Sequence, residues 1–197
     1  MAERRPDRAL LRRDVLPLLL LFAVLIAAAV LLDALLHALG LRWVGRWLGI
    51  PGVLLILLSM LYSLRKRKQI GFSTPAQWLA FHKIVAWAGS VLVLVHGGIH
   101  FNAILPWLAI AAMLTNVISG LTGTLLLSRA RAHFDAHRLH LLDEGLSADA
   151  VEQALHADSV TLQFLKGWRA VHIPIALAFA SLGLIHIGSI LWFWNWR

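Results

Sequence analysis

The fold of this chain is decided by two stretches, FHKIVAWAGSVLVLVHGGIH (residues 81–100) and GWRAVHIPIALAFASLGLIH (residues 167–186). Each contains two histidines 14 positions apart in an apolar run, namely His82 and His96 in the first and His172 and His186 in the second. Along an α-helix, 14 positions span about 21 Å and return to within about 40° of the starting direction, so both imidazoles of a pair share one face. Two such helices facing each other can hold two cofactors at two depths.

The composition is that of an integral membrane protein. The chain has 197 residues, of which 59% are apolar and 14% charged, and its mean hydropathy is +0.75. It has no cysteine, which excludes disulfides, cysteine-ligated iron–sulfur clusters and covalently attached c-type haem. The net charge is +8, but the basic residues flank apolar spans, where they set topology and attract lipid headgroups. We therefore expect membrane lipid as a partner and no nucleic acid.

The hydropathy pattern predicts an all-α integral membrane fold with five transmembrane helices. The last four form a cofactor-binding four-helix bundle, and one helix precedes them. Residues 1–14 form a basic cytoplasmic tail without a cleavage motif, so the first span is a retained anchor. Residues 15–197 form one membrane domain, with a cytoplasmic helical connection at 128–167. The expected spans are residues 15–36, 48–64, 78–100, 103–127 and 170–194.

The basic residues also predict the orientation. Fifteen of the 18 lysines and arginines fall on one side of this arrangement, and three fall on the other. By the positive-inside rule, the N-terminus is cytoplasmic and the C-terminus is outside, in a bacterial cytoplasmic membrane. The third and fifth spans then run in the same direction. His82 and His172 lie at one depth near the cytoplasm, and His96 and His186 lie at one depth near the outer face.

These matched depths favour two non-covalent b-type haems. The inner haem iron is expected between His82 and His172, and the outer one between His96 and His186. Ionisable residues inside a membrane are costly and usually functional. The main alternatives are a metal or proton transporter that uses intramembrane histidines, and a haem-free scaffold in which the histidines pack between helices. A transported metal favours ligands clustered at one depth with carboxylates nearby, which these spans lack.

Other residues of the same spans are candidate haem contacts. Gly89 and Phe179 lie midway between the histidines of their helices, where a glycine permits close approach and an aromatic ring fills the space between two macrocycles. Ordinary helix packing explains both residues as well. Lys83 and Arg169 are expected near the propionates of the inner haem. His100 shares the His82 face and is the alternative to His96 as outer ligand.

The connection at 128–167 is the only sizeable segment between spans. It is too short for a flavin or nicotinamide domain, so it is better suited to docking a separate partner. His133 and His137 recur at helical spacing, and a polar amphipathic helix is favoured there over a metal site. Gly145 is expected to end one helix, and Ser147 to cap the next.

The two quoted stretches resemble the ferric reductase-like transmembrane domain and the di-haem cytochromes b of bacterial respiratory complexes. The resemblance covers about residues 48–194. It implies bis-histidine haem ligation between the third and fifth spans, with an aromatic residue at the position of Phe179 between the haems. The chain lacks the fused flavin and nicotinamide domains, so we expect a separate cytoplasmic flavoprotein or iron–sulfur subunit. An outer-side acceptor or a quinone would complete the electron path. The alternative is a stand-alone quinol or metal reductase.

Overall fold

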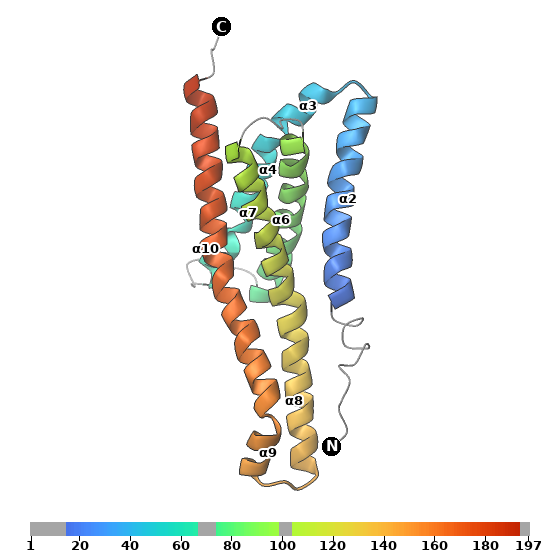
Figure 1. Ribbon diagram of the computed structural model, residues 1–197, viewed down its shortest axis with the longest axis vertical. Coiled ribbons are helices and arrows are strands. Elements are labelled where there is room, and N and C mark those ends of the chain that lie inside the picture. The colour runs from blue at the N-terminus through green and yellow to red at the C-terminus, as the bar shows by residue number, and fades with distance from the viewer. Residues whose placement is uncertain (1–14, 67–73, 99–103, 194–197) are drawn as a thin grey trace. The chain divides into compact units, whose positions relative to one another are not determined.

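The computed structural model describes residues 15–66, 74–98 and 104–193, and this part of the chain is helical without any strand (Figure 1). Within these described ranges, five helical segments are long and apolar enough to cross a membrane. The predicted all-α, multi-pass membrane fold is therefore confirmed. These segments are Leu16–Ala38, Arg42–Ser63, Ala76–Gly98, Ile104–Asp143 and Ala170–Phe193.

The helices follow one another with short connections. The elements are α2 (Leu16–Ala38), α3 (Arg42–Trp47), α4 (Gly49–Ser59), α5 (Leu61–Lys66), α6 (Pro75–Gly98), α7 (Ile104–Leu121), the π-helical turn η2 (Thr122–Leu126), α8 (Leu127–Asp143), α9 (Ala148–Ala154) and α10 (His156–Phe193).

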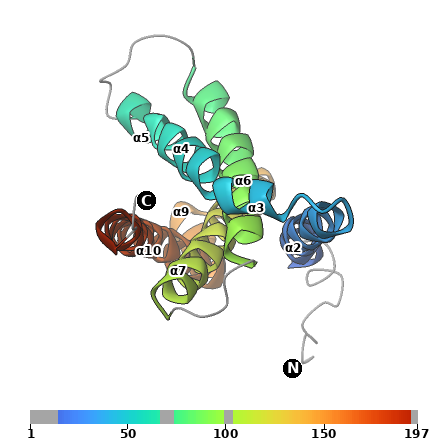
Figure 2. The same ribbon diagram turned by 90° about the horizontal axis from the view of Figure 1, so that it is seen from above.

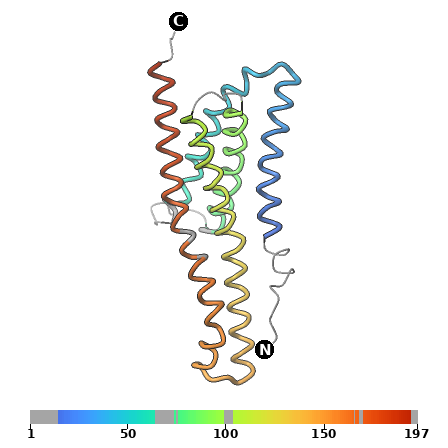
Figure 3. The backbone as a smooth tube through the Cα atoms, in the orientation of Figure 1, coloured from blue at the N-terminus to red at the C-terminus, as the bar shows by residue number. Residues whose placement is uncertain are grey.

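Three features of these helices differ from the expected spans. The second span is interrupted, because α3, α4 and α5 are separate helices. The fourth span continues through η2 into α8 as one path of 40 residues (Figure 3). The fifth span is the last 24 residues of α10, which begins at His156 and has 38 residues. Both helices that enter the connection at 128–167 are thus extensions of membrane helices.

The chain forms two compact units, and each is described here by itself. One consists of Met1–Phe22 and Leu114–Ala178, and the other of Ala23–Met113 and Phe179–Arg197. Three of the four candidate ligands, His82, His96 and His186, belong to the second unit. His172 belongs to the first.

In the second unit, α4 packs antiparallel against α6 (Figure 2). The two helices approach closely at Gly52 and Gly89. A Cβ atom on Gly89 would lie 2.8 Å from the carbonyl oxygen of Gly52, and one on Gly52 would lie 3.1 Å from the carbonyl oxygen of Gly89. A side chain at position 89 does not fit this crossing, because a real Cβ atom essentially never lies 2.8 Å from a backbone oxygen, and the 3.1 Å contact at position 52 is tighter than nine in ten real Cβ contacts.

The start of α6 is fixed by its own side chains. Thr74 is the N-cap residue, Pro75 occupies the first helical position, and Gln77 is the third. The side-chain Oε1 of Gln77 accepts a hydrogen bond from the Thr74 backbone N–H at 3.0 Å, and the Thr74 hydroxyl accepts one from the Gln77 backbone N–H at 3.4 Å. This reciprocal capping box sets the register of the helix that carries His82 and His96.

In the first unit, α8, α9 and the start of α10 form a helical hairpin. Gly145 has a φ of 78° and ends α8, with the Leu146 N–H donating to the Leu141 carbonyl at 3.3 Å. Ser147 then accepts a hydrogen bond from the Ala150 N–H at 3.4 Å and caps α9, so both predictions for this turn are confirmed. The hairpin buries Val151, Leu155 and Leu162.

Candidate cofactor-binding site

His82 is oriented by a backbone carbonyl of the neighbouring helix. It lies in α6 and is half-buried, and its Nδ1 is 2.9 Å from the carbonyl oxygen of Ser59 in α4. A carbonyl oxygen only accepts hydrogen bonds, so Nδ1 carries the proton and donates. In the neutral imidazole this places the free lone pair on Nε2. Such a bond to the second nitrogen is the usual support of a metal-ligating histidine.

The Ser59 carbonyl can accept this bond because the second span is interrupted at that residue. α4 ends at Ser59 and α5 begins at Leu61. The Ser63 N–H donates to Met60 at 2.8 Å, one residue closer than its α-helical partner Ser59 would be. The ring of Tyr62, just beyond the interruption, lies 5.5 Å from the His82 ring, measured between centroids. The interruption therefore supplies both an acceptor and an aromatic neighbour to His82.

His96 and His186 lie side by side within the second unit. Their ring centroids are 6.4 Å apart, and the ring planes are inclined by 58°. A metal–imidazole bond is about 2 Å long and the ring centre lies about 1 Å behind the nitrogen, so two axial imidazoles on one ion have centroids about 6 Å apart. The observed separation fits one metal ion between the two rings.

A glycine at the start of α4 leaves the space that the His96 ring occupies. A Cβ atom on Gly49 would lie 2.7 Å from Cδ2 and 2.8 Å from Cγ of His96. No larger residue fits without displacing the imidazole. The sequence pattern does not single out Gly49, because glycine is common in membrane helices.

His172 has a comparable neighbour in the first unit. Its Nδ1 is buried, and its Cε1 would lie 3.5 Å from a Cβ atom on Gly120 of α7. The π-helical turn η2 begins two residues after Gly120, and Pro174 interrupts the hydrogen bonding of α10 two residues after His172. Both helices therefore depart from regular α geometry beside this histidine, as π turns often do at functional sites.

The structure describes some of the other candidate haem contacts, and others lie outside the described residues. Gly89 is buried against α4, so its lack of a side chain is explained by helix packing, and its contact with a haem stays a prediction. Phe179 is half-buried in α10. Lys83 is exposed on α6 directly after His82. The side chain of Arg169 and all of His100 lie outside the described residues, so their proposed roles stay predictions.

A second histidine group lies in the hairpin of the first unit. His133 and His137 of α8 meet Asp158 of α10, and one ligand atom from each lies within 4.8 Å of the other two. The sequence pattern favours a polar helix over a metal site at these histidines, and it does not point to Asp158, which is 21 positions from His137 along the chain. The turn at Gly145 brings Asp158 of α10 opposite His133 and His137 of α8.

Comparison of the chain with protein-family models, with curated proteins and with solved structures finds no match. The functional assignment therefore rests on the chemistry of these residues.

Proposed function

We propose that this protein is a di-haem b-type cytochrome that moves electrons across the membrane. His82 and His172 would ligate the inner haem, and His96 and His186 the outer haem. The observation that carries the proposal is the 6.4 Å separation of the His96 and His186 rings, which suits two axial ligands of one iron. The hydrogen bond between His82 and the Ser59 carbonyl supports the same role for a second histidine, because it leaves Nε2 free to ligate.

Each residue of the site has a definite task in this proposal. The four imidazoles would hold the two haem irons, two to each iron, and would leave no position open for a substrate. The carbonyl of Ser59 fixes the tautomer and ring orientation of His82, and Gly49 makes room for the ring of His96. The apolar helices exclude water and lower the local dielectric constant, which tunes a redox potential. A bound haem would supply one-electron transfer.

The electron donor and acceptor are then separate molecules. The α8–α10 hairpin extends beyond the apolar part of its helices and offers a docking surface for a cytoplasmic flavoprotein or iron–sulfur subunit. A quinone or an outer-side acceptor would exchange electrons with the outer haem. The protein would act as the membrane subunit of an oxidoreductase complex in a bacterial cytoplasmic membrane.

A reduced-minus-oxidised spectrum of the purified protein, with a pyridine haemochrome count, tests the cofactor. The proposal predicts a b-type α band and two haems per chain. Vesicles that contain the protein and trapped ferricyanide then test the function, with an impermeant reductant added outside. Reduction of the trapped acceptor is expected with the wild type and is lost in His186→Ala. Absence of a b-type band, or equal reduction rates in both proteins, would refute the proposal.

A further inference from the structure

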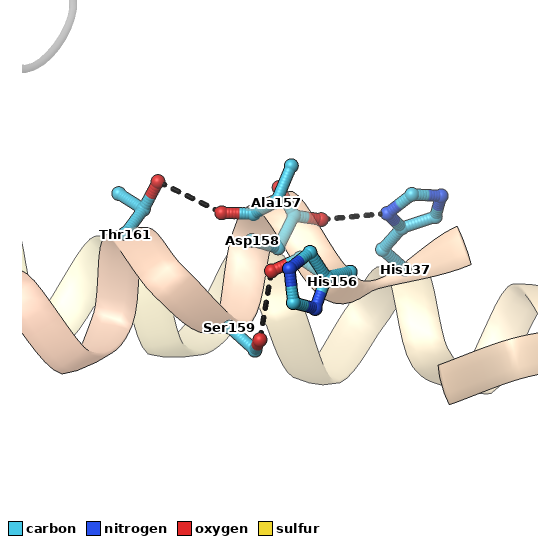
Figure 4. Close-up of polar contacts among 6 residues, drawn as sticks. All are labelled: His137, His156, Ala157, Asp158, Ser159 and Thr161. Carbon is cyan, nitrogen blue, oxygen red and sulfur yellow. Dashed lines mark hydrogen bonds and ion pairs between the residues drawn. The ribbon is translucent and has the colours of Figure 1, made fainter. Parts of the chain in front are cut away.

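The hairpin formed by α8 and α10 brings three potential metal ligands to one point. His133 and His137 are four positions apart on α8, so they lie on the same face of that helix. Their ring centroids are 6.0 Å apart. Asp158 projects toward them from the first turn of α10, and its Oδ2 is 2.9 Å from Nδ1 of His137 (Figure 4). The three ligand atoms lie within 4.8 Å of one another.

We propose that His133, His137 and Asp158 form a binding site for a divalent transition-metal ion such as Zn²⁺. Two imidazoles and one carboxylate are a ligand set found in zinc sites that keep a water molecule in the fourth position. Zinc ligands lie about 2 Å from the ion, so small rotations of the three side chains bring all of them into range. Imidazole nitrogens favour Zn²⁺, Co²⁺, Ni²⁺ or Cu²⁺ over Mg²⁺ and Ca²⁺, which prefer oxygen ligands.

A simple ion pair between His137 and Asp158 does not account for the whole group. Such a pair needs two residues, whereas His133 places a third ligand at the same point from the preceding turn of α8. The side chains of His137 and Asp158 are 40% and 32% exposed, so solvent and an ion can reach the site. An ion bound by Nδ1 of His137 and by Asp158 would take the place of the hydrogen bond between them, and the proton of the neutral imidazole would then sit on Nε2.

The location of the site gives it a structural consequence. An ion held by all three residues would join α8 to α10 and stabilise the hairpin in one arrangement. Asp158 and His172 are 14 positions apart on the same helix, so they share a face and lie about 21 Å apart along its axis. Metal binding would therefore order the segment that is best placed to dock a redox partner, without contacting a haem ligand.

Competition between the full-length protein in detergent and a chromophoric zinc chelator tests the site. We expect one high-affinity Zn²⁺ per chain, undiminished by excess Mg²⁺. His133→Ala and Asp158→Asn should each weaken zinc binding about tenfold or more, since even the loss of a supporting residue around a metal site costs about 10–100-fold. His140→Ala is the matched control, because this exposed histidine of α8 pairs with Glu144 and lies outside the cluster. It should bind zinc as the wild type does.

The far-ultraviolet circular dichroism and the gel-filtration profile of each variant in detergent serve as the test of correct folding and should not change, so the result does not depend on whether the protein binds haem. If His137→Ala folds poorly, the exposed His133 still provides the decisive variant. Zinc binding of equal strength in the wild type and in the His133→Ala/Asp158→Asn double variant would overturn the proposal. Absence of saturable binding to the wild type would overturn it as well.

Discussion

Ser59 and Gly49 position the two histidines of α6 in different ways. Ser59 contributes a backbone carbonyl that accepts from His82, and Gly49 contributes the absence of a side chain beside His96. The sequence alone predicts the histidines, because ionisable residues at a repeated spacing stand out in apolar spans. It does not predict the Ser59 carbonyl, since every residue has one. The Ser59 carbonyl is available to His82 because the helix is interrupted at that residue, and hydropathy does not reveal this interruption.

The close approach of Gly49 to the His96 ring predicts that a single added methyl group disturbs this ligand. Gly49→Ala should displace the His96 imidazole, because overpacking of this kind costs about 1–3 kcal/mol. We expect partial or complete loss of one of the two haems, measured by pyridine haemochrome. Gly188→Ala is the control, since a Cβ atom there meets nothing within 4 Å. If Gly49→Ala kept two haems with an unchanged spectrum, the glycine would have no role in positioning the ligand.

The expected spans agree well with the helices where apolar runs are long. They agree less well where a helix is interrupted within a span, or where it continues past the end of the span. The interruption between α4 and α5 and the π turn η2 have no hydropathy signal, because both lie within apolar sequence. The extensions of α8 and α10 beyond the membrane were predictable as helices from their polar periodicity. Their pairing was not, because it depends on the three-dimensional path of the turn between them.

The turn that joins α8 to α9 should control the stability of the hairpin. Gly145 adopts a φ of 78°, a conformation that costs other residues about 1–2 kcal/mol. Gly145→Ala should therefore increase hydrogen–deuterium exchange in α8 and α9 while the haem spectrum is unchanged. Gly167→Ala, within α10, should instead stabilise its helix by about 0.5–1 kcal/mol. Equal exchange in the two variants would contradict this assignment of the turn.

For the whole molecule, the distribution of basic residues predicts the orientation in the membrane. Because the chain has no cysteine, single introduced cysteines can be labelled without background. Ala148→Cys in the hairpin should react with an impermeant thiol reagent only after the cells are opened. Leu39→Cys, after the first span, should react in intact spheroplasts. Reactivity in the opposite order would reverse the predicted topology and exchange the inner and outer positions of the haem ligands.

The central claim is that one histidine of α6 and one of α10 hold each haem, and haem counts in paired variants test it most directly. The double variants His82→Ala/His172→Ala and His96→Ala/His186→Ala should each retain one haem per chain, whereas His82→Ala/His96→Ala should retain none. His100→Ala alone should retain two. A protein without haem from either of the first two double variants, or one haem retained in His82→Ala/His186→Ala, would contradict this pairing.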